Sequence, residues 1–217
     1  MPAAGSDPAC PLGRVQRGLE ALYRVDTGVE VGDFVVGAEL RDALVSARRP
    51  REQLLVCEGE GEMALALFID PRALANLVRF DPARRLGDHN LGDFLLAVEG
   101  VSHFIYAVCC ARVGRPVSQL ELELQAEVDK YVTCLLCGHL DRSAALRRRL
   151  FEQFSFEPDL DDEERDRYRT ANSNAQRYSA SLERRYVSGG RIADMLGELR
   201  RFYRLPLDGK LDHIRAA

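Results

Sequence analysis

The sequence lacks most of the signals that identify a protein's class. Residues 1–11 contain neither a basic stretch nor an apolar stretch, so they do not resemble a secretory signal peptide. No segment offers about 18 uncharged apolar residues in a row, which argues against a membrane-spanning helix. There is no internal repeat, and Gly189-Gly190 lacks the flanking strand of a phosphate-binding loop. We therefore expect a cytoplasmic protein without membrane contact.

Cysteines are few and do not have the spacing of a disulfide framework. Four of the six lie in apolar runs with a helical pattern, namely Cys109, Cys110, Cys134 and Cys137. Reduced, buried thiols suit such positions and favour a reducing compartment. The C-x-x-C spacing of the last two also occurs in redox and zinc sites. It falls at the end of a predicted helix, however, where the helix dipole does not lower a thiol pKa. We predict buried, apolar cysteines.

The chain also lacks the net basic charge that nucleic-acid-binding surfaces carry. Its formal net charge is −4 and its pI is about 5.7. Residues 141–217 are charge-dense but nearly balanced, with 16 basic and 14 acidic side chains. Arginines and tyrosines along residues 165–178 could grip RNA, but Glu163 precedes Arg167 by four residues, which favours ion pairs on a helix surface. We expect no DNA partner and place RNA binding third among the functional hypotheses.

What is present is a chain long enough to bury a large core. It has 217 residues, of which 46% are hydrophobic, and this fits one domain or a domain with a small appendage. We predict a flexible N-terminus over residues 1–12 and a single helix-rich domain over residues 13–217. That domain could divide into a core of residues 13–140 and charge-dense C-terminal helices over residues 141–217.

The first 70 residues predict two helices and a β-hairpin. Apolar spacing indicates helices over residues 15–25 and 38–48, with Leu40, Leu44 and Ala47 on one side of the second. Residues 53–57 and 63–69 are β-prone runs separated by Glu-Gly-Glu-Gly-Glu, which predicts a hairpin turn. Because the second run is almost entirely apolar, we expect both of its faces to be covered.

From Asp70 onward the pattern predicts only helices. Asp70 followed by Pro71 is a favoured helix start, and we expect Val78 to face inward. Asn90 with Asp93 resembles a capping box, and it opens a helix that runs to about residue 113.

A second capping box, Ser118 with Glu121, opens the next helix, which ends at Gly138. The short connection between these two helices predicts an antiparallel helical hairpin over residues 90–138.

The C-terminal part predicts a short helix, a long helix and two further elements. The long helix, over residues 162–187, carries tyrosines and alanines spaced by three and four, a seam that packs closely where the alanines fall. A helix over residues 192–203 and a short turn over residues 211–214 follow. The predicted fold is helix-dominated α+β, with a small N-terminal β-hairpin packed on a bundle of five or more helices and the antiparallel helical hairpin at its centre.

The helical hairpin carries the strongest candidate for a site. Glu99 and His103 are four residues apart and share a face of the first helix, and Glu123 and Glu127 share a face of the second. Carboxylate and imidazole groups on facing helices are how metal sites in helix bundles are built. The sequence therefore predicts a site for a divalent metal such as Zn, Mn or Fe, with Glu123 as a secondary ligand.

A structural interpretation of the same residues competes with the metal site. Glu99 and His103, with Lys130, would form a buried polar pair that fixes the register of two packed helices. The known di-iron bundles place Glu-x-x-His in two helices, and this chain has neither copy. In the acidic run of the second helix, we expect Glu121 and Asp129 to face water.

Tyr131, Asn172 and Arg169 form a second candidate group. An asparagine in the middle of a helix costs helix propensity and therefore needs a reason. Asn172 lies beside Arg169 at the edge of the tyrosine and alanine seam, where the group could line a polar pocket.

For function, the first hypothesis is a non-catalytic cytoplasmic protein that works through protein–protein contacts and needs no cofactor. Its partner surface would be the charged C-terminal helices or the acidic second helix of the hairpin, and a homo-oligomer is compatible with it. The alternative is a metal-binding protein or metal-dependent enzyme that uses the Glu/His group. Whether the chain is an enzyme is open at this point.

Overall fold

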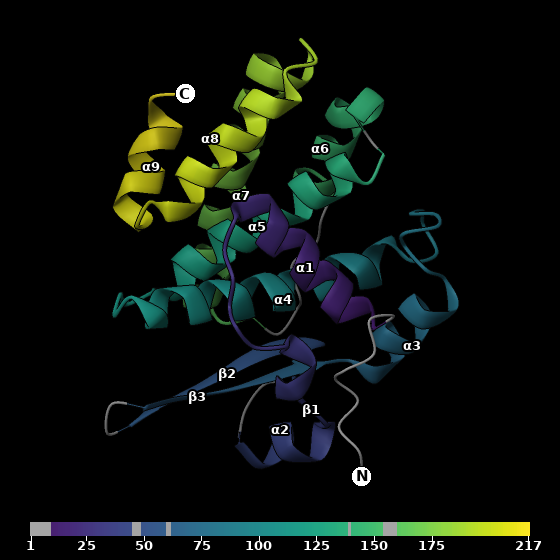
Figure 1. Cartoon of the computed structure of the whole chain (residues 1–217), viewed down its shortest axis with the longest axis vertical. Helices are drawn as coiled ribbons and strands as arrows, with labels where there is room; N and C mark the ends of the chain where they lie inside the picture. Colours follow the sequence, from purple (N-terminus) through teal and green to yellow (C-terminus); the bar gives the residue numbers. More distant parts are fainter. Residues whose placement is uncertain (1–9, 45–48, 60–61, 139, 154–159) are drawn as a thin grey trace. The chain divides into compact units, whose positions relative to one another are not determined.

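The computed structural model describes residues 10–44, 49–59, 62–138, 140–153 and 160–217 (Figure 1). The chain forms two compact units. Unit 1 comprises the described residues of Met1–Ala21 and Val25–Arg115, and unit 2 comprises those of Leu22–Arg24 and Pro116–Ala217.

The limits of these units differ from the predicted subdivision. The predicted boundary at residue 140 lies inside unit 2. Of the predicted flexible N-terminus, residues 1–9 lie outside the described part of the chain, and helix α1 (Pro11–Tyr23) begins within the remainder.

Unit 1 contains a three-stranded sheet in the order β1-β3-β2. Strands β2 (Glu52–Gly59) and β3 (Glu62–Ile69) form the predicted hairpin, with Val56 level with Leu65. Its turn, residues 60–61, lies outside the described residues. The short strand β1 (Val35–Val36) pairs in parallel with the base of β3. Strand β2 is therefore an edge strand, because no described strand pairs with its outer side.

Helices cover the base of this sheet on both faces (Figure 1). Helix α4 (Leu91–Arg112) packs on β2 and β3. The guanidinium of Arg41, from helix α2 (Ala38–Leu44), stacks over the Phe68 ring on the other face, 4.0 Å from its centroid. Leu67, Phe68 and Ile69 are buried as a result.

The prediction that both faces of β3 are covered is right for this base and wrong toward the turn. There, Ala64 is exposed, and Met63 and Leu65 are only half-buried. The covering helices do not reach this part of the hairpin, so the hydrophobic pattern of β3 continues beyond the region that unit 1 buries.

In α2, the shared apolar side is exposed rather than buried: Leu40 and Leu44 are 49% and 61% exposed, and Arg41 is the buried residue. The helix rotates this way because the arginine stem and guanidinium cover the aromatic ring beneath them. Residues 45–48, the end of this predicted helix with Ala47, lie outside the described residues. In helix α3 (Pro71–Arg79), contrary to the prediction, Val78 is 70% exposed while Leu77 fills the core.

Local capping signals decide where the helices of unit 1 begin. The Asp70 side chain accepts a hydrogen bond from the Arg72 N–H, and Pro71 stands at the first position of α3, as predicted. The predicted capping box at Asn90 is wrong. Its side chain makes no cap bond and instead donates to the carbonyls of Phe80 and Arg85, which fixes the loop before α4.

Unit 2 is helical throughout its described part. It contains α5 (Gln119–Leu136), α6 (Ser143–Phe151), α7 (Asp162–Leu182), α8 (Ile192–Arg204) and α9 (Leu207–Arg215). A 3-10 turn, Leu140–Arg142, precedes α6, and a π-helical turn, Glu183–Val187, extends α7 to the predicted length. The last element is a full helix rather than the predicted short turn.

The start of α5 and the packing face of α7 follow the predicted patterns. The Ser118 hydroxyl accepts a hydrogen bond from the Glu121 N–H at the start of α5. Ala171 and Ala175 of α7 are completely buried in the predicted seam, where α7 packs against α5. Tyr178 continues the seam and stacks on Phe202 of α8 at 4.0 Å.

The fold class is the predicted one: a helix-dominated α+β protein with a small sheet. Helices α4 and α5 occupy the predicted positions, but they belong to different units. Their antiparallel pairing therefore stays a prediction. By length and composition alone α4 could cross a membrane, but it is mostly buried, as core helices are.

Candidate functional site

His103, the centre of the predicted metal group, has a partner that the sequence pattern did not suggest. Its Nδ1 lies 3.5 Å from the Glu52 Oε1 at the start of β2, and both side chains are 8% exposed. Gly100, one turn earlier on α4, allows this approach. A Cβ atom there would lie 3.0 Å from the Glu52 Cγ and 3.2 Å from the Ile69 Cδ1. The pair therefore joins α4 to the sheet within unit 1.

The other three predicted ligands lie in different surroundings. Glu99 is half-buried on α4 in unit 1, and Glu123 and Glu127 lie on α5 in unit 2. Glu127 Oε1 accepts a hydrogen bond from the Lys130 Nζ at 2.6 Å, an ion pair at a spacing of three whose side chains are only 15% and 14% exposed. Across the described residues, no group of three or more His, Cys, Asp or Glu side chains could hold a metal ion. The metal site stays a prediction from the sequence.

The residues of the predicted polar pocket differ in depth. Tyr131 is completely buried, its ring 6.1 Å from that of Phe151, and burial raises the pKa of its hydroxyl well above the usual value. Asn172 is buried, whereas Arg169 lies at the surface and pairs with Asp166 at 2.7 Å. The structure therefore puts Arg169 in a surface ion pair, and the pocket stays a prediction.

A buried chain of polar side chains crosses unit 2, and the sequence interpretation missed it. The Tyr23 hydroxyl donates to Asp129, which also accepts from the Gln125 Nε2 at 2.8 Å. The Gln125 Oε1 accepts a hydrogen bond from the Lys210 Nζ. All four side chains are at most 1% exposed. The chain connects the end of α1 with α5 and α9.

Aromatic rings enclose the lysine end of this chain. The Lys210 Nζ lies 4.6 Å from the centroid of the Phe202 ring and 5.8 Å from that of Tyr203. Tyr203 in turn stacks on Tyr23 at 4.1 Å. The faces of aromatic rings attract a buried ammonium group. Here Gln125 also links the Lys210 ammonium to the Asp129 carboxylate through hydrogen bonds.

The tyrosine end is held in its protonated state. Burial, followed by the negative charge of Asp129, raises the pKa of Tyr23 well above its usual value. The hydroxyl therefore stays a donor to the carboxylate at all physiological pH values. The four polar side chains are sealed from solvent. Their hydrogen bonds can fix the packing of three helices, and in this conformation a substrate cannot reach them.

These burials overturn the prediction that Glu121 and Asp129 face water. They are 3% and 1% exposed. A signal was present in the sequence: Gln125 and Asp129 are four residues apart on one helix, which places both on one face. The partners of this face, Tyr23 and Lys210, are distant in sequence and could not be identified from spacing.

A second polar group holds α9 against α8. Glu198 is 1% exposed and accepts hydrogen bonds from the Arg201 guanidinium and from His213. The His213 ring meets the Tyr178 and Phe202 rings edge-on at about 6 Å. Together with Lys210, these contacts explain why the C-terminal segment is a docked helix rather than a turn.

The six cysteines form no disulfide and differ in burial. Cys110 and Cys134 are buried as predicted, whereas Cys109, predicted to be buried as well, is half-buried, as is Cys10. Burial raises the pKa of Cys134 to about 12. Cys57 and Cys137 are exposed, so burial of the whole C-x-x-C pair is wrong for its second member.

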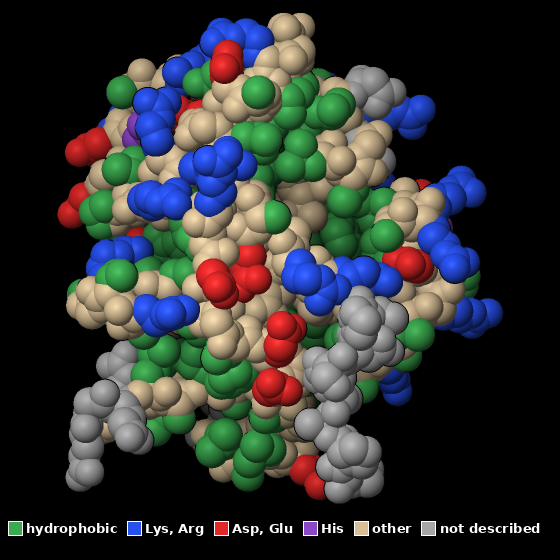
Figure 2. Space-filling view, in the orientation of Figure 1, with side chains coloured by type: hydrophobic (Ala, Val, Ile, Leu, Met, Phe, Trp, Pro, Cys, Tyr) green, Lys and Arg blue, Asp and Glu red, His purple; other side chains and the backbone are tan. Residues whose placement is uncertain are grey.

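The distal half of the β2–β3 hairpin is the clearest unpartnered surface in unit 1. Val56 is 47% exposed at the centre of the edge strand, and the neighbouring Cys57 is exposed too. Leu54 and Leu55 are half-buried. Figure 2 shows hydrophobic side chains along this part of the molecule toward the turn. Apolar side chains on an edge strand are a template for pairing with another chain.

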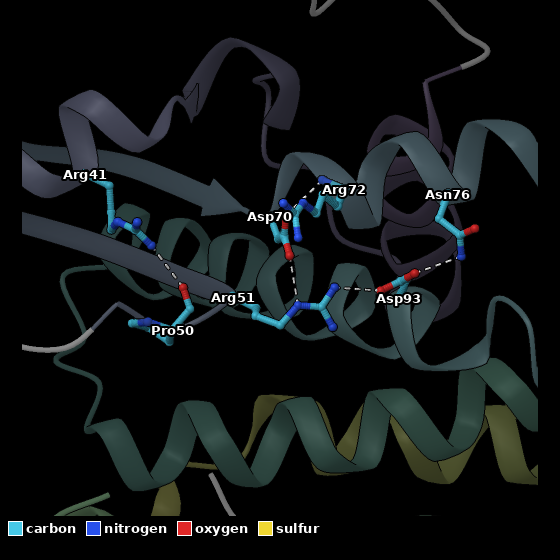
Figure 3. A network of polar contacts seen from close by, with 7 residues as sticks. All are labelled: Arg41, Pro50, Arg51, Asp70, Arg72, Asn76 and Asp93. Atoms are coloured by element: carbon cyan, nitrogen blue, oxygen red, sulfur yellow. Dashed lines mark hydrogen bonds and ion pairs between the residues drawn. The ribbon is translucent and has the colours of Figure 1, made fainter. Parts of the chain in front are cut away.

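A polar clamp fixes the base of the hairpin (Figure 3). The Arg51 guanidinium donates to the Asp70 carboxylate and to the Asp93 carboxylate, both at 2.9 Å. Asp93 also accepts from the Asn76 Nδ2 at 2.8 Å. The clamp joins the start of β2 to the end of β3 and to α4, so the distal part of the hairpin projects from a rigid support.

Comparison with known proteins gives no further guide. No protein-family model, curated protein or solved structure matches this chain. Its function has to be inferred from its own residues.

Proposed function

We propose that this chain is a non-catalytic protein that binds another protein segment by strand addition along the outer edge of β2. One observation carries the proposal: an eight-residue edge strand presents exposed Val56 and Cys57 at its centre. In strand addition, main-chain hydrogen bonds supply affinity and alternate side chains supply specificity. The clamp at Arg51 supports it, since a fixed strand loses less entropy on binding.

The exposed side chains are needed as well as the strand edge. Pairing along eight residues forms roughly eight backbone hydrogen bonds, each with a net contribution of about 0.5–1.5 kcal/mol. Association costs about 4–15 kcal/mol in lost freedom of motion. Because the two ranges overlap, hydrogen bonds alone give weak binding. Burying the apolar surface of Val56 adds to them, and we expect affinities on the order of micromolar.

The charged surfaces first considered as partner sites support binding less well. Three acids of α5, Glu121, Glu123 and Asp129, are buried, so this helix offers no continuous acidic stripe. On α7, Arg165 pairs with Asp162 and Arg169 with Asp166, each acid lying three residues before its arginine. Such pairs neutralise each other and leave little net charge for a partner.

The buried polar chain of unit 2 supports a structural role for its lysine. Lys210 and Asp129 are chemically capable groups, but they are 0% and 1% exposed. A catalytic group has to reach substrate, and the burial of both groups separates them from solvent. We therefore assign them to packing specificity.

Site-specific photo-crosslinking tests the proposed function. A photoactivatable residue replaces Val56 in the full chain, and a control carries it at Val78, which is exposed on α3. We expect irradiation in cells to give a discrete protein adduct from position 56. The adduct partner, purified, should bind the wild-type chain and bind the Val56→Lys variant at least about tenfold more weakly. Absence of any adduct at position 56, or binding that Val56→Lys leaves unchanged, would overturn the proposal.

A further inference from the structure

We infer that unit 2 carries a binding site for phosphate groups, formed by Arg24, Arg200 and Arg204. In the described part of the chain, none of these arginines pairs with an acidic side chain, and main-chain carbonyls hold two of their guanidiniums in place. The site uses no residue of the β2 edge, so this inference and the proposed function can each fail without the other.

Two arginines one turn apart on α8 bind the main chain at the end of α1. The Arg200 Nε donates to the Leu22 carbonyl at 2.8 Å, and the Arg204 Nη2 donates to the Tyr23 carbonyl at 3.1 Å. The last carbonyls of a helix have no partner within it, and basic side chains commonly bind them. Because the two carbonyls belong to consecutive residues, the two guanidiniums lie close together. Figure 2 shows basic side chains gathered around α8.

The carbonyl contacts leave the hydrogen-bond donors of Arg200 that suit a phosphate. Arg204 uses both of its Nη groups, since Nη1 also donates to the Arg200 carbonyl at 2.7 Å. Arg200 is held only through its Nε, so no described acceptor bonds to its Nη1 or Nη2. These two groups form the fork with which arginine binds two oxygens of one phosphate. Because the Nε bond already orients the fork, less side-chain entropy is lost on binding.

Arg24 adds the third positive charge and has a strained backbone. Its φ is 52°, the only positive φ of a described residue other than glycine. The position after a helix often takes this left-handed conformation, but glycine is favoured there because a side chain makes it unfavourable. The Arg24 side chain is exposed and makes no hydrogen bond or ion pair with a described residue. No described contact needs an arginine here, and strain of this kind is found where a side chain has a function.

The acids closest to these arginines along the chain have other contacts. Glu198 on α8 accepts hydrogen bonds from Arg201 and from His213. The Asp26 carboxylate accepts a hydrogen bond from the Gly28 N–H at 2.8 Å. The carbonyl end of α1 contributes only about half a negative charge. The site therefore keeps a positive charge that the described contacts do not balance.

This charge and the free fork favour phosphate over a carboxylate. A phosphate ester carries about −1.5 to −2 charges at pH 7 and offers three acceptor oxygens, whereas a carboxylate carries one charge. Arginines at a spacing of four, as on α8, also repel each other until an anion lies between them. Surface arginines such as Arg165 and Arg169 differ, because each already pairs with an acid.

Isothermal titration calorimetry of the full chain tests the site with two probes, inorganic phosphate and pyrophosphate. At a fixed ionic strength of about 0.15 M, we expect saturable 1:1 binding of pyrophosphate with a Kd on the order of 0.1–1 mM. Pyrophosphate that binds more tightly than phosphate assigns the site to linked phosphate groups, and equal affinities assign it to a single one. No saturable binding of either probe up to about 10 mM overturns the inference.

Arg24→Gly is the most informative variant, because it removes a charge and relieves the backbone without removing a described side-chain contact. We expect its thermal midpoint without ligand to rise and its affinity for pyrophosphate to fall about tenfold. A purely structural residue would not separate stability from binding in this way. Arg200→Lys keeps the charge and removes the fork, so it should bind pyrophosphate several-fold more weakly than wild type.

Arg169→Gln is the matched control, since it also removes one exposed positive charge from unit 2. It should bind pyrophosphate as wild type does. Equal losses of affinity for Arg24→Gly and Arg169→Gln would mean that only the overall charge attracts the anion, and this would overturn the site. Unchanged affinity in Arg24→Gly would overturn it as well. Circular dichroism confirms that each variant folds.

Discussion

Unit 1 leaves apolar residues of its strand edge and helices exposed, whereas unit 2 draws charged residues into its interior. In unit 1, Leu44 and Val56 are 61% and 47% exposed. In unit 2, Lys210 and Glu198 are 0% and 1% exposed. An exposed apolar surface is unfavourable in water until a binding partner covers it. A buried charge is stable only when the side chains that pair with it are in place. The difference is in keeping with the proposed binding of a protein segment by unit 1, and it gives unit 2 an interior held together by buried polar contacts.

The largest expected effect follows from disrupting the buried, hydrogen-bonded side chains of unit 2. Lys210→Met removes the positive charge at one end of this polar group, while the Asp129 carboxylate at the other end stays buried. Leaving a buried hydrogen-bonding group without its partner typically costs about 1–3 kcal/mol, and more where a charged group is involved. We expect urea unfolding, followed by circular dichroism, to show a loss of this size in the free energy of unfolding.

Arg169→Met is the control for the loss of an exposed positive charge. Arg169 pairs with Asp166 at the surface, with side chains 61% and 74% exposed, so its loss should cost less than about 1 kcal/mol. Equal losses for the two variants would contradict the assignment of Lys210 to a structural role.

The contact of α4 with the sheet gives the next largest effect. Gly100→Ala places a methyl group 3.0–3.2 Å from Glu52 and Ile69, tighter than ordinary packing. Overpacking of this kind costs about 1–3 kcal/mol, more than the roughly 0.5–1 kcal/mol that alanine gains in a helix. We expect a lower thermal midpoint for the variant.

Gly18→Ala in α1 is the control for helix propensity, because no atom lies within 4 Å of the added methyl group. It should raise the midpoint slightly. A rise for Gly100→Ala as well would show that the Glu52 side chain moves aside easily and that the α4 contact is loose.

The clamp at the base of the hairpin gives a smaller, pH-dependent effect. Partial burial raises the pKa of Asp70, but hydrogen bonds from the Arg72 N–H and the Arg51 guanidinium outweigh it, so the pKa is lower than usual. A carboxylate with a lowered pKa in the folded state stabilises the fold above its unfolded value, near 3.9. This contribution is lost as the pH falls through the folded value.

Asp70→Asn tests the clamp, since asparagine keeps the helix cap and removes the charge. We expect the thermal midpoint of wild type to fall more steeply than that of the variant from about pH 5 to pH 2. If the thermal midpoints of wild type and variant fell equally with pH, the charge of Asp70 would not stabilise the base of the hairpin.

These cases show which features sequence patterns could predict. The starts of α3 and α5 were predictable because the Asp70-Pro71 pair and Ser118 act on backbone groups within three residues. The hairpin was predictable from its two β-prone runs around a glycine-containing turn. The orientation of α2 was not, because seven residues give a weak periodicity and the buried Arg41 outweighs it by stacking on Phe68.

The polar groups were predictable only in part, for a related reason. His103 stood out as a polar residue on an apolar helix, but its partner Glu52 is 51 positions earlier in the sequence, on a strand. Tyr23 and Asp129 are separated by 106 residues, and Lys210 and Gln125 by 85. Helical spacing says which side chains share a face and nothing about which distant element meets that face.

Thiol labelling sharpens the comparison of exposed and buried surface without changing the fold. Cys57, on the β2 edge, and Cys137 should react quickly with a thiol reagent, as both are exposed. Cys134 should react only after unfolding, since it is buried and its pKa of about 12 leaves almost no thiolate at pH 8. Peptide mass spectrometry over time gives the order.

Metal removal is expected to have the smallest effect, and it bears on both units because the four predicted ligands are divided between them. Glu99 and His103 belong to unit 1, and Glu123 and Glu127 to unit 2. His103 meets Glu52, and Glu127 meets Lys130. A metal that binds only the folded state would raise its stability by mass action. We expect EDTA to leave the thermal midpoint of the untagged chain unchanged. The metal-site hypothesis would be restored if EDTA lowered the thermal midpoint, added Zn, Mn or Fe reversed this, and Glu127→Gln abolished the effect. An ion pair between Glu127 and Lys130 alone gives no such metal dependence.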